Sequence, residues 1–183
     1  KQSQDINKEL FDFSFDVISH EKNFYDALQT IFKEVCLYFS LDRSTLMERI
    51  KSSQKISVTA KWAREDDGND AELMEQTSVG NWSAMEATYK SAEYLIIENG
   101  KSEENDFTKD VVIMKKMPVT AVQFPIMDGD KMTGALTFER WTLKEWTQVE
   151  ISTLASITKM ISSYLLAIQT KTELETEYIV NNI

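Results

Sequence analysis

The sequence contains little of several residue types on which common functional sites depend. Its 183 residues include one cysteine, one histidine, five glycines and two prolines. A single cysteine, Cys36, excludes an intrachain disulfide, and a single histidine, His20, leaves a zinc or haem site without its usual ligands. Five glycines are too few for glycine-rich phosphate loops. The sequence therefore predicts no metal site and no bound cofactor.

Positive charge is also scarce, and no long hydrophobic run is present. Lys and Arg number 20 against 30 Asp and Glu, a net charge of −10. Such a surface repels nucleic acid and anionic lipid. No apolar run approaches the roughly 20 residues that cross a bilayer, and no basic, apolar leader opens the chain. We therefore expect a soluble, cytoplasmic protein that neither binds nucleic acid nor inserts into a membrane. Its start at Lys1 suggests a segment of a longer protein.

Apolar residues are plentiful enough for one core. Hydrophobic residues make up 42% of the chain, and a domain of this length buries roughly 70% of its unfolded surface. Two acidic stretches, 64–75 and 98–110, lack the periodicity of ordered elements and are interpreted as loops. "DDGND" within the first is out of register with a calcium-binding loop.

Helical periodicity marks both ends of the chain. Apolar residues three and four apart predict helices over 5–18 and 23–41, separated by "SHEKN". "TQVE" at 147–150 is a capping box that opens a third helix, which continues toward Val180 as a charged rod. A second capping box, Ser83 with Glu86, predicts a short helix.

Strands are predicted between these helices, over 43–50, 55–63, 93–100 and 119–140. In the second of them Ile56, Val58, Ala60 and Trp62 alternate and are expected on one side. The stretch 107–117 has contiguous apolar residues, and its structure stays open between a helical turn and irregular chain.

The stretch 119–140 predicts a hairpin whose register is set by burial. A two-residue Asp-Gly turn would mix apolar and polar faces, so we predict a three-residue loop or a bulge, with Asp130 left-handed and Phe124 opposite Gly134. Pro125 cannot donate to a ladder, so its strand is expected to lie at an edge or to carry the missing donor on an unpaired side. The apolar face would carry Val122, Phe124, Ile126, Met132, Leu136 and Phe138.

"AVQFPIMDGDKMTGALTFERWTLKEWTQVEISTLASI" and the order of elements around it resemble a GAF domain over about 22–170. The resemblance implies an α+β fold, three-layer-like, with an antiparallel sheet of about six strands, terminal helices packed on one face and short helices and loops on the other. It divides the chain into a linker and dimerisation helix (1–20), the domain (21–170) and a signalling-helix extension (171–183).

GAF domains generally sense small molecules inside larger signalling proteins, so the resemblance implies a non-enzymatic sensor or regulatory domain of a bacterial protein. Its partners would be an unknown small-molecule ligand, a second copy in a homodimer, and a covalently linked effector, a diguanylate cyclase or a histidine kinase. The ligand-binding residues expected at the GAF cavity are Trp62, Trp82, Met85, Tyr89, Tyr94, Ile96, Met114 and Phe124. The expected dimer interface is Leu10, Phe13, Val17, Leu154, Ile157, Ile161, Tyr164 and Ile168.

Two alternatives stay open. The chain could be an enzyme like the GAF-type methionine sulfoxide reductases, although Cys36 stands alone in a helical pattern and is expected to be a buried small hydrophobe rather than a catalytic thiol. It could also be a degenerate GAF domain that only supplies dimer geometry. No Ser-His-Asp order or carboxylate pair predicts catalytic residues, and the signature of cyclic-nucleotide-binding GAF domains is absent.

Overall fold

The computed structural model describes residues 6–50, 55–65, 75–78, 82–98 and 119–183. These residues form one six-stranded antiparallel sheet of order β3-β2-β1-β6-β5-β4, with helices on both faces. The elements are α1 (Lys8–His20), α2 (Phe24–Phe39), β1 (Arg43–Arg49), β2 (Lys55–Ala63), β3 (Glu75–Ser78), α3 (Trp82–Tyr89), β4 (Leu95–Glu98), β5 (Thr120–Asp128), β6 (Lys131–Arg140) and α5 (Gln148–Asn181).

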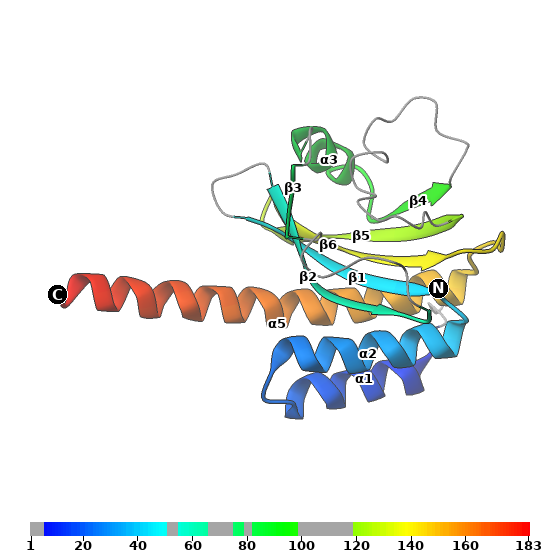
Figure 1. Ribbon diagram of the computed structural model, residues 1–183, viewed down its shortest axis with the longest axis horizontal. Helices are drawn as coiled ribbons and strands as arrows, with labels where there is room; N and C mark the ends of the chain where they lie inside the picture. Colours follow the sequence, from blue (N-terminus) through cyan, green and yellow to red (C-terminus); the bar gives the residue numbers. More distant parts are fainter. Residues whose placement is uncertain (1–5, 51–54, 66–74, 79–81, 99–118) are drawn as a thin grey trace, which may run out of the picture.

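The helices divide unequally between the two faces of the sheet (Figure 1). α2 and α5 lie on one face, and α1 packs against both of them on their outer side. α3 lies on the other face. The core is correspondingly divided into a large cluster under the helices and a small cluster beneath α3 that contains Met47, Ile56, Tyr89, Met132 and Ala135. The α+β fold with terminal helices on one face is confirmed.

The boundaries of the terminal helices have local causes. Asn7 and Asn23 cap α1 and α2 by accepting backbone N–H groups of the first turn. Ser40 ends α2 in a left-handed conformation, with φ of 54°. The Thr147–Glu150 capping box that opens α5 is confirmed, and α5 runs unbroken to Asn181.

The predicted capping box at Ser83 is wrong. α3 begins at Trp82, so Ser83 lies within the helix rather than at its N-cap. The carboxylate of Glu86 instead accepts the backbone N–H of Met132, at 3.3 Å, and so joins α3 to the hairpin of β5 and β6.

The sequence did not predict β3, which begins at the end of the stretch 64–75 that was interpreted as a loop. The stretch 107–117, whose structure the sequence left open, lies outside the described residues.

The hairpin contains the predicted bulge but not the predicted loop. Asp128 pairs with Lys131, so the turn has two residues, Gly129 and Asp130. The ladder then shifts between Met127 and Ile126, which leaves Thr133 as the extra residue. Gly129, with φ of 64°, takes the left-handed conformation that the sequence had assigned to Asp130.

This bulge changes which face each residue of β6 occupies. Beyond it Leu136 and Phe138 face the helices, as expected, but before it Met132 faces α3. Phe124 pairs with Leu136 and not, as predicted, with Gly134. The large cluster thus takes in five of the six residues of the predicted apolar face.

A second bulge produces the same effect in β2. Leu46 pairs with Ala60 and Met47 with Val58, so Thr59 is the extra residue. Ile56 and Val58 therefore face α3, whereas Ala60 and Trp62 face the helices. The predicted single-sided alignment of β2 is wrong because a bulge reverses the alternation of side chains.

One 18-residue stretch of α5 is long and apolar enough to cross a membrane by length and composition. Half of that stretch is buried inside the protein, as in the core helix of a soluble domain. It is therefore weak grounds for a membrane span.

Candidate ligand cavity

One half of the outer edge of β5 is left open by its neighbour. β4 pairs with β5 only from Thr120 to Gln123, so among the described residues the rest of β5 has no partner on that side. β5 is not an edge strand of the sheet, but Pro125 lies beyond its pairing with β4, which agrees with the other expectation, a missing donor on an unpaired side. The phenol of Tyr89 reaches the backbone oxygen of Gln123 at the point where the ladder ends.

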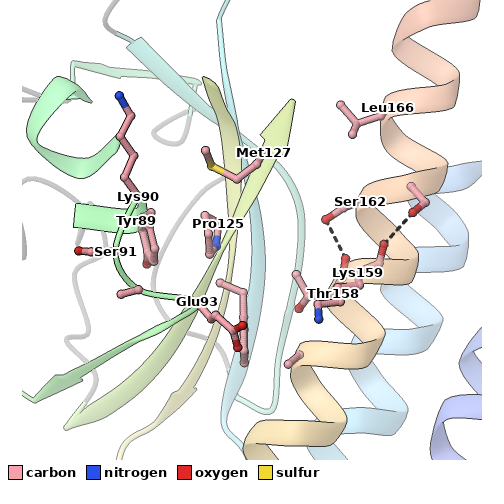
Figure 2. A pocket seen from close by; sticks show the side chains of 14 residues that line it. Tyr89, Lys90, Ser91, Glu93, Pro125, Met127, Thr158, Lys159, Ser162 and Leu166 are labelled. Atoms are coloured by element: carbon pink, nitrogen blue, oxygen red, sulfur yellow. Dashed lines mark hydrogen bonds between the residues drawn. The ribbon is translucent and has the colours of Figure 1, made fainter. Parts of the chain in front are cut away.

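A cavity of about 580 Å³ lies against this open edge (Figure 2). One wall is the segment 89–93, which connects α3 to β4, and the opposite wall is α5 from Ala155 to Leu166. Phe124, Pro125 and Met127 of β5 lie between the walls. Its volume is that of a small-molecule site, and α5 supplies a whole wall of it.

A buried hydrogen-bond network holds one wall to the sheet. Tyr89 donates to the side-chain oxygen of Gln123 at 2.8 Å, and the Gln123 amide donates to Thr137 at 3.0 Å. Burial raises the pKa of Tyr89 far above its usual range, so the phenol remains a donor at any physiological pH. The network fixes the end of α3 on the central strands.

The structure brings together three of the predicted ligand-binding residues. Tyr89 and Phe124 line the cavity, and the ring of Tyr94 lies 6.0 Å from that of Phe124. Two others are placed elsewhere, since Trp62 packs on the helix side of the sheet and Ile96 is exposed on β4. Nothing is described for the side chains of Trp82, Met85 and Met114.

Sequence reasoning missed the contribution of α5 to this cavity. Thr158, Lys159, Ser162 and Leu166 line it, all within a stretch interpreted only as a dimer surface. Polar residues interleaved with the apolar stripe of this helix were the available signal, because a helix that only packed on a sheet would have its polar residues in water.

The predicted dimer residues fall into two groups. Leu10, Leu154, Ile157 and Ile161 are buried in the core of the chain itself and are not available to a second copy. Phe13 and Ile168 are 39% exposed, and Val17 and Tyr164 are half-buried. The apolar stripe of α5 therefore serves first to pack the helix on the sheet.

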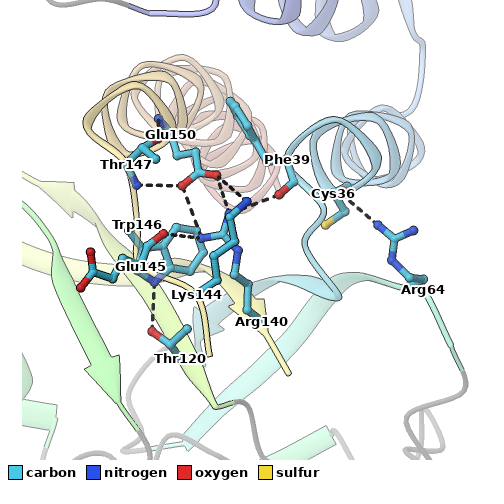
Figure 3. Close-up of polar contacts among 10 residues, drawn as sticks. All are labelled: Cys36, Phe39, Arg64, Thr120, Arg140, Lys144, Glu145, Trp146, Thr147 and Glu150. Atoms are coloured by element: carbon cyan, nitrogen blue, oxygen red, sulfur yellow. Dashed lines mark hydrogen bonds and ion pairs between the residues drawn. The ribbon is translucent and has the colours of Figure 1, made fainter. Parts of the chain in front are cut away.

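A buried charged cluster joins the sheet to the start of α5 (Figure 3). Arg140, at the end of β6, binds the Glu150 carboxylate through both terminal nitrogens, at 2.5 and 3.3 Å. It also donates to the Phe39 carbonyl at the end of α2, 3.2 Å away, and lies 4.1 Å from the ring of Trp146. Trp146 donates in turn to Thr120. One guanidinium thus joins α2, β6 and α5.

Cys36, the only thiol of the chain, lies fully buried in α2. Burial raises its pKa to about 12, so almost no thiolate is present at neutral pH. The described residues also contain no group of three His, Cys, Asp or Glu side chains placed to hold a metal ion.

The sequence matches the GAF domain family over residues 23–165. The chain belongs to the GAF family. A comparison with curated proteins finds no match. Among solved structures, it is similar to the GAF domain of a phosphoenolpyruvate-protein phosphotransferase from Acinetobacter, with 13% identity, a TM-score of 0.68 and coverage of 89% of this chain and 94% of that one.

Two further solved structures with this fold differ in function. The free methionine-R-sulfoxide reductase of Neisseria meningitidis, solved with its substrate, matches at 9% identity and a TM-score of 0.66, covering 90% of each chain. A phycocyanobilin-bound GAF domain of a cyanobacterial phytochrome matches at 12% identity and a TM-score of 0.68, covering 90% of this chain and 94% of that one. At these identities the likeness shows the fold of this GAF domain and not its ligand.

Proposed function

We propose that this GAF domain is a non-enzymatic sensor in which a small molecule binds the cavity beside β5 and shifts α5. The observation that carries the proposal is that α5 is both a wall of the cavity and a helix of 34 residues that continues well beyond the sheet. A ligand that touches Lys159 and Leu166 therefore contacts the output element directly. Such a ligand changes the position of α5 only by binding its two placements unequally.

The exposed end of α5 supports a role in transmission. Gln169 donates to Glu48 of β1 at 3.1 Å, and beyond this contact the helix is exposed to its end. Its last turns nevertheless carry Leu174, Tyr178 and Ile179, which are 60 to 70% exposed. Apolar side chains repeated on an exposed helix favour contact with another helix.

We extend the proposal to a parallel homodimer. Its interface would use Phe13 and Val17 of α1 with Tyr164 and Ile168 of α5, and α1 packs beside α5 as this requires. Deleting α1 to test it would also remove buried Leu10 from the core, so surface substitutions are a cleaner test. Phe13→Ser with Ile168→Ser should shift sedimentation equilibrium toward monomer, whereas Leu143→Ser, at a residue 85% exposed, should not. A dimer unchanged by the double substitution would end this part of the proposal.

The effector is proposed to be a covalently linked diguanylate cyclase or histidine kinase of a bacterial, cytoplasmic signalling protein. A buried thiol with a raised pKa disfavours the methionine sulfoxide reductase alternative, because that chemistry needs an accessible thiolate. A GAF domain that binds nothing and only sets dimer geometry is the remaining alternative.

The test measures whether a ligand in the cavity moves the exposed end of α5. Because Cys36 is buried, a spin label added through Glu177→Cys would react at that site alone. Compounds found by a thermal-shift screen should change the distance between labels in the dimer. Ser162→Trp, which fills the cavity, should abolish both the thermal shift and the distance change, and Thr170→Trp, on the exposed side of the same helix, should abolish neither. Ligands that bind equally to the filled cavity would refute the site.

A further inference from the structure

Thr158 presents a buried hydroxyl group without a partner at the wall of the cavity. The residue is 4% exposed, and its side-chain oxygen forms no hydrogen bond with any residue that the structure describes. Its own carbonyl, by contrast, accepts a hydrogen bond from Ser162 at 2.7 Å. Figure 2 shows Thr158 on the side of α5 that faces β5. Buried hydroxyls in proteins are almost always hydrogen-bonded, so this one lacks the partner that a polar group of a bound molecule would supply.

Two opposite charges face the same opening. Figure 2 shows the Glu93 carboxylate on one wall and the Lys159 ammonium group on the other, with Pro125 above Glu93. Within the described part of the chain, neither side chain forms a hydrogen bond or an ion pair. The ammonium group of the third charged residue, Lys90, points away from this opening. The cavity therefore offers one cation and one anion on opposite walls, and the two form no ion pair with each other.

The remaining lining is apolar and runs along β5 and α5. Phe124, Met127 and Leu166 supply it, and Phe124 is itself buried. A carboxylate, an ammonium group and an apolar side group on one small framework would match these three features together. The volume of about 580 Å³ leaves room for a large side group.

We propose that the ligand of this cavity is a free amino acid with a large apolar side chain. Its carboxylate lies toward Lys159, its ammonium group toward Glu93, and its side chain against Phe124, Met127 and Leu166. Thr158 donates a hydrogen bond to the carboxylate. This inference rests on the proposed function, because it names the ligand class of the same cavity.

The test uses three compounds that differ only in their charged groups. L-phenylalanine carries both charges, 3-phenylpropionate lacks the ammonium group and phenethylamine lacks the carboxylate. Titration calorimetry on the chain of residues 1–183 should show L-phenylalanine binding about fivefold more tightly than either analogue, the effect of one solvent-accessible charge pair. L-methionine and L-leucine should bind as well, and L-aspartate should not.

Substitutions assign each charge to its residue. Glu93→Gln should remove the protein's preference for L-phenylalanine over 3-phenylpropionate. Lys159→Gln should remove its preference for L-phenylalanine over phenethylamine. Lys171→Gln, at an exposed position of α5 beyond the cavity, is the charge-matched control and should change neither preference.

Thr158→Val separates a binding role from a structural one. This substitution should weaken the binding of L-phenylalanine about fivefold. It should not lower the Tm of the free protein, because it removes a hydroxyl that has no partner in the described structure. Thr153→Val is the matched control: Thr153 is also buried, but its hydroxyl oxygen accepts the Asn7 N–H at 2.8 Å, so this variant should lower the Tm and leave binding unchanged.

Three results would overturn the proposal. The first is that no amino acid binds at millimolar concentration. The second is that L-phenylalanine and 3-phenylpropionate bind equally well, and the third is that only extended peptides bind. If another compound binds and Ser162→Trp abolishes its binding, the sensor function stands and only the ligand class fails. If no compound binds the cavity, both fail.

Discussion

Arg140 and Glu150 form a buried ion pair, with a shortest distance of 2.5 Å, where the sheet passes into α5. Their side chains are 1% and 7% exposed, so each charged group has lost its contact with water and is paired with the other. Glu150 also accepts the Thr147 N–H at 2.8 Å as part of the capping box. One carboxylate therefore starts the helix and holds it to the sheet.

Removing the charge of Glu150 should destabilise the domain strongly. Glu150→Gln leaves the buried Arg140 guanidinium without its counterion, and losing one partner of a buried pair costs about 3–5 kcal/mol. Urea unfolding followed by circular dichroism measures the loss. Glu145→Gln is the control, because the Glu145 side chain is exposed and only the backbone oxygen of this residue accepts a hydrogen bond from Arg140. Equal stability of the two variants would contradict this role.

The same pair should make stability depend on pH. Burial alone would raise the pKa of Glu150, but hydrogen bonds from Arg140 and the Thr147 backbone lower it below its usual range. A lowered pKa in the folded state gives stability that is fully present above the ordinary pKa of about 4.3 and is lost as the pH falls through the folded value. The difference in unfolding free energy between wild type and Glu150→Gln should therefore shrink below about pH 4. Parallel curves down to pH 3 would refute the assignment.

Gly134 should tolerate no side chain. A Cβ atom there would lie 2.4 Å from the backbone oxygen of Met47, so β1 and β6 could not keep their spacing. Gly134→Ala should cost about 1–3 kcal/mol in a denaturant titration. Gly129 has open space around it but a φ of 64°, so Gly129→Asn should be tolerated, since Asn adopts that conformation readily. Gly134→Asn should be worse than Gly134→Ala.

Deleting Thr133 should preserve the fold. Without this bulge residue Met127 still pairs with Met132 and Ile126 with Gly134, and each side chain keeps its face. We expect a loss of less than about 1.5 kcal/mol, in the range of ordinary single changes. Deleting Ala135 should cost more, because closing the bulge would then move Thr133 into the position of Gly134, where a Cβ atom would lie 2.4 Å from the Met47 backbone oxygen. Similar losses for both deletions would show that the bulge itself is required.

Cys36 should resist alkylation in the folded protein. Its burial and raised pKa leave no accessible thiolate, so iodoacetamide should react only when the protein opens. A cysteine introduced as Glu177→Cys on the exposed part of α5 should react at the rate of a free thiol under the same conditions. Rapid modification of Cys36 by native-state mass spectrometry would reopen a redox role.

Features set by neighbouring residues could be predicted from the sequence. Spacing and caps located α1, α2 and α5, and the conflict between Asp-Gly and the apolar pattern of the hairpin required a bulge or an odd loop. These features follow from interactions within a few residues along the chain. The position of the bulge was beyond this reasoning, because Thr133 and Gly134 are placed by contacts with β5 and β1.

The residues of the candidate site also divide into those that the sequence predicted and those that only the tertiary structure placed. Tyr89 and Phe124 were expected at a cavity from the family resemblance, and both line it. Thr158 and Lys159 were not, because polar residues interleaved with the apolar stripe of α5 indicate that some of them leave water but not which of them face a gap. That gap lies where, among the described residues, the pairing of β4 with β5 ends at Gln123.

The sequence by itself determined the helices, the hairpin and the GAF family, since periodicity, capping and turn chemistry act locally. Only the tertiary structure decided which face Met132 and Val58 occupy, that α5 is a wall of the cavity, and that Arg140 joins three elements through Glu150 and Phe39. The physical reason is that a strand ladder, a buried charge and a cavity each depend on groups far apart in the chain, whose meeting is fixed only when the core is packed.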